Sequence, residues 1–185
     1  VQTLRILELP ELICAAASDH DVPLRNVTIE VTESRLIDDI ATSLEVLSRL
    51  CLRGMRLAID DFGTGYSSLE QLKMIPFEEL KIDRIFVHNS AQDAESLAIL
   101  KSSIQLANSL GLRVVAEGIE TKEDWNTTSL LGCHIGQGYY LQRPLPADQF
   151  INWVDDWGYS REKWAWRDHG NRNVKPVQRN KKTAS

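Results

Sequence analysis

The sequence has few cysteines and no long apolar run. Its three cysteines, Cys14, Cys51 and Cys133, are far apart and show no CxxC spacing. This argues against a disulfide framework or a zinc site and is typical of reduced thiols in a cytoplasmic protein. Because no apolar run approaches the ~20 residues of a membrane span, no membrane segment is expected. With 43% apolar residues in 185, the chain can bury one sizeable core, which predicts one main domain.

Positive charge is scarce in most of the chain. The net charge is −5, yet residues 159–185 hold eight Lys and Arg against two acidic residues, so the remaining body carries −11. An acidic body disfavours a DNA-binding surface. The composition therefore predicts a main domain over residues 1–158 and a basic, partly disordered C-terminal extension over residues 159–185.

Short β-rich runs alternate with longer helical runs. The predicted strands are Asn26–Val31, Met55–Asp60, Glu79–Ile82, Arg113–Ala116 and Ile135–Tyr139. The predicted helices are Pro10–Ser18, Leu36–Arg53, Leu69–Met74, Ala94–Leu110, Lys122–Leu131 and Pro146–Trp157. Such alternation indicates an α/β fold with a parallel sheet. The unit length suits a doubly wound sheet or a (β/α)₈ barrel, and since a barrel needs about 250 residues, length alone favours the open sheet.

Every predicted strand is followed by, or contains, polar groups near its carboxyl end. These residues are Glu30, Glu33, Asp60, Asp61, Lys81, Asp83, Glu117, Glu120 and Gln137. The carboxyl ends of parallel strands face one shared crevice, so these side chains are expected to converge although they span about a hundred positions.

Adjacent aspartates at the end of an apolar strand are unfavourable unless a cation pairs them. Their hard oxygen ligands select Mg²⁺, Mn²⁺ or Ca²⁺, and no His or Cys cluster points to zinc. Asp60 and Asp61 can bridge two ions, with Glu30 and Glu117 completing their coordination. Two such ions suit in-line attack on phosphorus, with Lys81 orienting or deprotonating the attacking water or stabilising charge.

Each residue also has a purely structural interpretation. Asp61 could cap a helix, Glu33 could cap the helix that follows it, and Glu120 could cap the helix after Thr121. Lys81 could be a surface lysine whose stem covers apolar neighbours. The occurrence of the whole set at five strand ends favours the metal site.

Five motifs in order resemble the EAL-domain family of cyclic-di-GMP phosphodiesterases, which open the cyclic dinucleotide to linear pGpG. They are IEVTES (Ile29–Ser34), AIDDFGTGYSSL (Ala58–Leu69), LKID (Leu80–Asp83), VVAEGIET (Val114–Thr121) and GQGYYLQRPLP (Gly136–Pro146). The resemblance runs from about Val1 to Trp157 and implies a modified (β/α)₈ TIM-like barrel instead of the open sheet.

The resemblance also implies roles for individual residues. It makes Glu30, Asp60, Asp61 and Glu117 metal ligands, and it places Lys81 at the catalytic water. Glu117 and Glu120 would take part in catalysis, and Asp83 and Gln137 would lie on the substrate side. Glu33 would hold the loop that begins Phe62-Gly63-Thr64-Gly65, which in the family lies at the dimer face. The implied cofactor is a pair of Mg²⁺ or Mn²⁺ ions.

Two family ligands have no counterpart in this sequence. The first is in the Glu-Ala-Leu strand, which would lie upstream of this sequence. The second is an asparagine that ends the next family strand in a pattern like V-N-L-S. Val1 or Gln2 lies near its expected place, and this sequence has no asparagine before Asn26. The expected fold is therefore an incomplete barrel lacking its first strands. Three explanations stay open: a piece of a larger active protein, a degenerate domain, or strands supplied by another subunit.

Two functions follow from these alternatives. The first is a phosphodiesterase in bacterial second-messenger signalling, fused to or regulated by an upstream sensory, receiver or GGDEF domain, with the chain as given inactive. The second is a silent cyclic-di-GMP receptor or interaction module. Because an unclosed barrel exposes a parallel edge, a homodimer that covers the edge is also predicted.

Overall fold

The computed structural model describes residues 6–33, 40–65 and 69–159, which fall into two units, residues 1–144 and 145–185, each described by itself. The first unit holds five strands in one sheet: β1 (Thr28–Thr32), β2 (Arg56–Phe62), β3 (Glu79–Ile82), β4 (Arg113–Ala116) and β5 (Ile135–Gly136). Its helices are α1 (Leu9–Asp19), the 3₁₀ turn η2 (Leu24–Asn26), α2 (Ile40–Leu52), α3 (Leu69–Met74), α4 (Arg84–Val87), α5 (Ala94–Ser109) and α6 (Lys122–Leu131). The second unit contributes α7 (Ala147–Tyr159).

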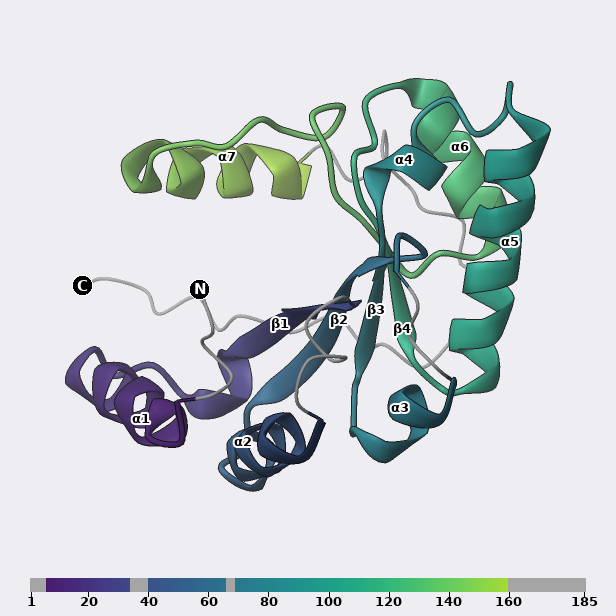
Figure 1. Cartoon of the computed structure of the whole chain (residues 1–185). Coiled ribbons are helices and arrows are strands. Elements are labelled where there is room, and N and C mark those ends of the chain that lie inside the picture. The colour runs from purple at the N-terminus through teal and green to yellow at the C-terminus, as the bar shows by residue number, and fades with distance from the viewer. Residues whose placement is uncertain (1–5, 34–39, 66–68, 160–185) are drawn as a thin grey trace, which may run out of the picture. The chain divides into compact units, whose positions relative to one another are not determined.

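The strand order decides between the two architectures that length left open. All neighbours in the sheet are parallel, and the order is β1-β2-β3-β4-β5, the order of the chain. The first four of these strands are labelled in Figure 1. A doubly wound sheet reverses its order at a switch point, whereas a (β/α) barrel adds each strand beside the last. The described strands therefore form five consecutive units of a barrel-like fold, and the open doubly wound sheet suggested by length is wrong.

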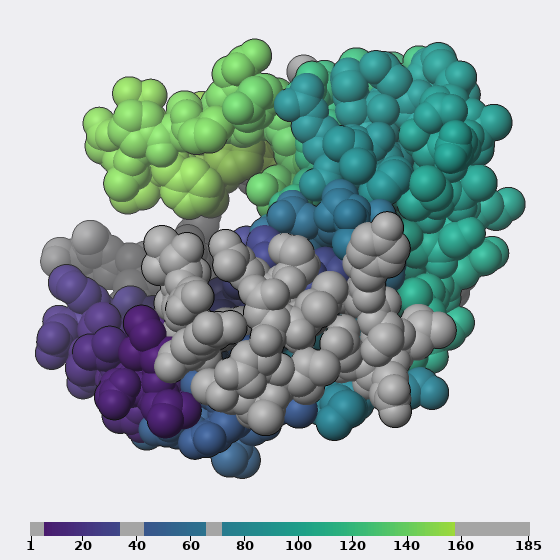
Figure 2. All heavy atoms as spheres, in the orientation of Figure 1, coloured from purple at the N-terminus to yellow at the C-terminus, as the bar shows by residue number. Residues whose placement is uncertain are grey.

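The core lies between the sheet and the helices that pack on it. Each of the central strands β2, β3 and β4 has three consecutive buried residues, as apolar runs in parallel sheets do. Helix α5 packs against β3 and β4 and also against α4, with which it forms one continuous surface (Figure 2). Leu100, Ile104 and Ala107 of α5 are at most 2% exposed.

Local signals set most element boundaries. Helix α5 begins where the Asp93 carboxylate accepts hydrogen bonds from the Glu95 and Ser96 amides, and α6 begins at the capping box of Thr121 and Asp124. The β4 strand and helices α3 and α6 have the predicted bounds. The predicted fifth strand is wrong beyond Gly136, because β5 contains only two residues.

Helix α7 is strongly amphipathic and presents a row of aromatic rings. The rings of Phe150 and Trp153 are 5.8 Å apart between centroids, and those of Trp153 and Trp157 are 5.1 Å apart. The contacts divide the chain after Pro144, so the domain boundary near residue 158 stays a prediction. The predicted disorder of residues 160–185 lies outside the described residues. No described helix is both long and apolar enough to cross a membrane.

Candidate metal centre and adjoining groove

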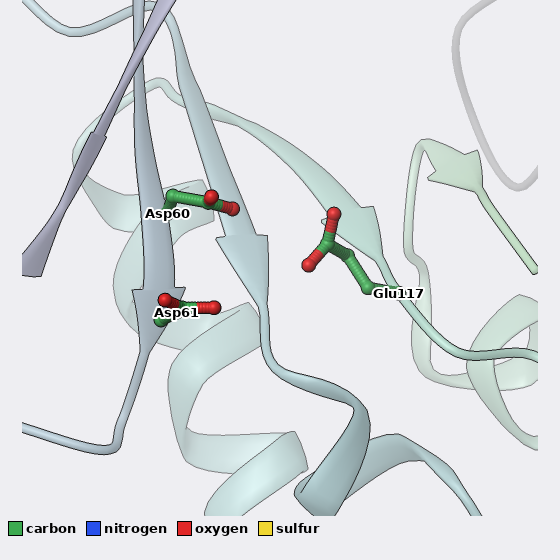
Figure 3. A group of neighbouring side chains, drawn as sticks. All are labelled: Asp60, Asp61 and Glu117. Atoms are coloured by element: carbon green, nitrogen blue, oxygen red, sulfur yellow. The ribbon is translucent and has the colours of Figure 1, made fainter.

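Asp60 and Asp61 lie near the end of β2, where the strand is irregular. In a regular strand two successive side chains point to opposite faces. Here the pairing with β3 shifts between Ile59 and Phe62, and Asp61 adopts a left-handed φ of 55°. This bulge turns both carboxylates toward the same side, where Glu117 joins them (Figure 3). One oxygen from each of the three carboxylates lies within 4.8 Å of the other two.

The register of the sheet brings Lys81 into the same place. Lys81 pairs with Val115 of β4, so Glu117, two residues further along, points to the same face as Lys81. Between β1 and β2, Glu30 pairs with Ala58, and Asp60 is two residues after Ala58, so Glu30 and Asp60 point to the same face. Four charged side chains from β1, β2, β3 and the end of β4 therefore share one face of the sheet.

Lys81 lies at the centre of this group. It is 5% exposed, which excludes the interpretation as a surface lysine. Its Nζ is 2.9 Å from Glu30 Oε2, 2.9 Å from Asp60 Oδ1 and 2.8 Å from Glu117 Oε1. Glu30 is half-exposed, and the Lys81 ammonium group links its carboxylate to those of Asp60 and Glu117.

The electrostatics of the cluster favour bound cations. Burial lowers the pKa of Lys81, but hydrogen bonds to Glu117, Glu30 and Asp60 raise it by more. The net pKa is above its ordinary value, so the side chain of the metal-free protein is an ammonium ion. Burial raises the pKa of Glu117, and the nearby Asp60 and Glu30 add to the rise, while Lys81 opposes it. Burial and the neighbouring Asp60 and Asp83 carboxylates raise the pKa of Asp61. In the metal-free protein Lys81 is therefore a hydrogen-bond donor to the carboxylates around it.

The donor set fits divalent cations. Four carboxylates face one lysine, which leaves three negative charges uncompensated within the cluster when all are ionised. Asp60 Oδ1 is buried and lies 2.9 Å from the Lys81 ammonium group. Several carboxylate oxygens close together, with too few positive charges to balance them, are the environment that Mg²⁺ and Mn²⁺ prefer.

A groove of about 240 Å³ adjoins the cluster. It is lined by Arg84, Glu117, Gly118, Glu120, Gln137, Gly138 and Tyr139. Of the residues predicted from the sequence, Glu117, Glu120 and Gln137 therefore lie together at one groove. The Arg143 guanidinium stacks on the Tyr139 ring at 4.3 Å.

Asp83 lies at the other side of the cluster. Its carboxylate accepts a hydrogen bond of 2.8 Å from the Ile85 amide and so caps α4, and it faces Asp61. It does not line the groove, so its predicted contact with substrate stays a prediction.

Glu33 holds the loop that follows β2. It is 3% exposed, and its Oε2 accepts hydrogen bonds of 3.0 Å from both Gly63 and Gly65. Thr64 closes the turn by donating to the Asp61 carbonyl over 2.8 Å. The structure therefore joins Glu33 to Gly63 and Gly65 within one protomer, while the role of Phe62–Gly65 at a dimer face stays a prediction.

Three residues near the groove were not predicted from the sequence: Arg84, His88 and Asp124. Arg84 pairs with Glu120 at 2.9 Å, and its stem covers Gly118. Asp124 is 2% exposed and its Oδ2 lies 3.1 Å from His88 Nδ1. The Thr-x-x-Asp pattern of Thr121 and Asp124 signals the helix start, but no sequence pattern signals the contact with His88.

A parallel, barrel-like sheet with clustered carboxylates and a buried lysine at its strand ends defines an α/β domain with a candidate metal site at the carboxyl ends of its strands. The chain belongs to the EAL domain family, whose model matches residues 2–144. The matched range contains the whole sheet, the carboxylate cluster and all of the five motifs except the last two residues of the fifth.

Individual relatives agree with the assignment. The cyclic di-GMP phosphodiesterase RocR of Pseudomonas aeruginosa is 42% identical over 145 residues, which cover 78% of this chain and 37% of that protein. The bifunctional diguanylate cyclase/cyclic di-GMP phosphodiesterase MucR of the same organism is 43% identical over 71% of this chain and 19% of its own length. The chain thus spans well under half the length of these relatives.

Solved structures show the same fold. The MucR phosphodiesterase in complex with c-di-GMP superposes with a TM-score of 0.77 at 40% identity, covering 80% of this chain and 60% of that one. The EAL domain of Mycobacterium smegmatis DcpA gives 0.75 at 36% identity, covering 80% and 67%. The Klebsiella pneumoniae BlrP1 manganese/cy-diGMP complex gives 0.70 at 34% identity, covering 74% and 35%. The predicted TIM-like EAL fold is confirmed.

Proposed function

We propose that this chain provides the catalytic face of a divalent-metal-dependent phosphodiesterase that hydrolyses cyclic di-GMP to linear pGpG. The observation that carries the proposal is the meeting of Asp60, Asp61 and Glu117 around buried Lys81, at the strand ends of a domain whose relatives include named cyclic di-GMP phosphodiesterases. The relatives' names state their own activity; the geometry of this cluster supports the same chemistry here.

Asp60, Asp61 and Glu117 would hold the cations, with Glu30 turning from Lys81 toward them. Mg²⁺ or Mn²⁺, two ions in the full site, would supply charge neutralisation and a more acidic attacking water. A solved relative contains manganese together with the dinucleotide, which supports this choice of metal.

The protein residues have separate tasks in the proposed reaction. A water oxygen bonds to phosphorus as the bond from phosphorus to the 3′ oxygen breaks, the 3′ oxygen gains a proton, and the product keeps a 5′-phosphate. Lys81, whose Nζ lies beside Glu117 and Asp60, would orient the attacking water or stabilise the negative charge that develops on the phosphoryl oxygens. The groove beside Glu117, with Arg84 and Gln137 in its lining, would receive the nucleotide.

The partners of the whole protein are also proposals. Relatives such as the oxygen sensor protein DosP of Escherichia coli are several times longer than the matched segment, which supports regulation by further sensory, receiver or GGDEF domains. Among the described strands, β1 and β5 form the two edges of the sheet. A homodimer that protects such an edge would be detected by light scattering, and a stable monomer that unfolds cooperatively would exclude it.

Hydrolysis of cyclic di-GMP to pGpG with Mn²⁺ or Mg²⁺ tests the function. The assay compares the wild type with Asp60→Asn. Asp93→Asn is the control, because Asp93 is an exposed cap of helix α5 and is not part of the carboxylate cluster. Each variant is measured in this chain and in the longest protein that its gene encodes. Activity lost only in Asp60→Asn supports the phosphodiesterase. Binding of the dinucleotide without hydrolysis in either length would instead support the silent receptor.

A further inference from the structure

The buried Asp124 carboxylate joins two segments that are distant in sequence. Its Oδ2 accepts from the amides of Glu120 at 3.1 Å and Thr121 at 3.0 Å, and faces His88 Nδ1 at 3.1 Å. Its Oδ1 accepts from the Asn89 amide at 3.0 Å. The segment after α4 is thereby tied to the loop between β4 and α6.

Helix capping explains only part of this arrangement. The capping box of α6 requires the bond from the Thr121 amide, but it does not involve His88 or Asn89, which lie 36 and 35 positions away. Asn89 adopts a left-handed φ of 57°, a conformation in which asparagine is found more often than most non-glycine residues. Burial alone would raise the pKa of Asp124, yet hydrogen bonds from His88, Asn89 and Glu120 hold it below its ordinary value. The carboxylate is thus maintained as an acceptor for all four groups.

The same network reaches the groove through Glu120. The Glu120 carboxylate pairs with Arg84 at 2.9 Å, and its other oxygen is 3.9 Å from His88 Nε2. Both Glu120 and Arg84 line the groove beside Glu117. His88 therefore faces the buried Asp124 with one ring nitrogen and the groove carboxylate with the other.

We propose that Asp124 and His88 are positioning residues: they fix the backbone and the carboxylate of Glu120, and so set the affinity of the groove for a cyclic dinucleotide without contributing to metal binding. The inference rests on the proposed function for its substrate. Asp124 holds the loop between β4 and α6 at Glu120 and Thr121. The same loop is also held at Ile119, whose amide donates to the Gln137 carbonyl and whose carbonyl accepts from the Tyr140 amide, both over 3.0 Å.

We expect changes at Asp124 or His88 to leave metal binding unaffected, because the metal ligand Glu117 is held by other contacts. Its amide donates to the Ile82 carbonyl over 3.1 Å, and its carboxylate pairs with Lys81. Neither contact involves Asp124 or His88. A change at Asp124 should therefore move the substrate groove more than the metal ligands.

The test compares Asp124→Asn with Asp93→Asn in the full chain. Asp93 is a matched control because it also accepts two amide hydrogen bonds at a helix start, those of Glu95 and Ser96, but lies outside the groove. Three quantities are measured: hydrogen exchange of the Glu120 and Thr121 amides without any ligand, affinity and KM for cyclic di-GMP, and affinity for Mn²⁺.

For Asp124→Asn we expect exchange at Glu120 and Thr121 to accelerate. We also expect KM or the dissociation constant for cyclic di-GMP to rise roughly tenfold, the change that corresponds to the loss of about one buried hydrogen bond. Mn²⁺ affinity should stay within about twofold of the wild type. Mutation of a residue that hydrogen-bonds to a metal ligand typically lowers metal affinity by roughly tenfold or more, so a smaller change shows that Asp124 does not support the metal ligands. Asp93→Asn should change none of the three. Unchanged dinucleotide affinity in folded Asp124→Asn would reduce Asp124 to a helix cap and overturn the inference.

His88 provides an independent rescue test. His88→Asn keeps a side-chain N–H near the position of Nδ1, whereas His88→Ala removes it, so we expect His88→Asn to bind the dinucleotide more tightly than His88→Ala. Equal binding by the two variants and the wild type would overturn the role of His88. If the wild type neither binds nor hydrolyses cyclic di-GMP even in the longest protein that its gene encodes, the proposed function fails and the substrate part of this inference with it. Hydrogen exchange still decides whether Asp124 fixes the loop.

Discussion

Lys81 Nζ lies 2.8 Å from Glu117 Oε1 because the parallel register of β3 and β4 places the two side chains on one face of the sheet. The same nitrogen also contacts Glu30 and Asp60. The ammonium group therefore occupies the position between carboxylates that a divalent cation would also favour. Lys81 and bound cations share ligands, and this sharing has consequences that can be measured.

Replacing Lys81 with methionine should make the metal-free protein less stable but more responsive to metal. Without the ammonium group the carboxylates repel one another, and we expect a loss of about 1–3 kcal/mol at neutral pH, less than for a fully buried pair because Glu30 is half-exposed. Mn²⁺ should then raise the melting temperature more in Lys81→Met than in the wild type, and hydrolysis should fall by about 100-fold. Thermal unfolding with and without Mn²⁺ measures the first effect. Lys101→Met, at an exposed position of α5, is the control, and an equal Mn²⁺ response in all three proteins would contradict shared ligands.

Replacing Gly118 with alanine should displace Arg84 from the groove. Gly118 has a φ of +64°, and a Cβ there would lie 2.2 Å from Arg84 Cγ. Gly54→Ala is a matched control, because Gly54 has a φ of +89° but nothing within 4 Å of the added Cβ. Both variants should lose about 1 kcal/mol to the left-handed conformation, and Gly118→Ala should lose about 1–3 kcal/mol more to the clash. Denaturant unfolding measures the difference between the two, and similar losses would show that Arg84 moves away freely.

The strands and the convergence of the site could be predicted from the sequence, whereas the local geometry of the site could not. Runs such as Arg113–Ala116 are short, apolar and bounded by turns, so their type and limits were predicted correctly. The bulge at Asp61 depends on pairing with β3, and a single strand carries no signal for it. The short helix α4 was missed because four residues show no helical period. The contact of His88 with Asp124 forms only when the chain between them folds.

Replacing Glu33 with alanine should loosen the loop after β2. Glu33 Oε2 accepts from both Gly63 and Gly65, so Glu33→Ala leaves two amides without this acceptor, while Glu33→Gln retains one side-chain oxygen. We expect exchange of the Gly63 and Gly65 amides to accelerate in the order wild type, Glu33→Gln, Glu33→Ala. Hydrolysis should decrease in the same order, by about tenfold in Glu33→Ala, since Asp61 precedes the loop. Accelerated exchange with full activity would separate the loop from catalysis.

Stability should fall on acidification in a way that depends on Asp124. Its hydrogen bonds hold its pKa below the ordinary value in the folded protein, so the unfolded chain takes up a proton first as the pH decreases. The stabilisation is fully present above the unfolded pKa of about 4 and is lost as the pH falls through the lower, folded value. Asp124→Asn cannot take up this proton, so its free energy of unfolding should change less between pH 5 and pH 2 than that of the wild type. Urea unfolding at several pH values measures the difference, with Asp148→Asn in the first turn of α7 as an exposed control. Parallel pH profiles for wild type and Asp124→Asn would show that the folded carboxylate has an ordinary pKa and that its four contacts do not favour the charged form.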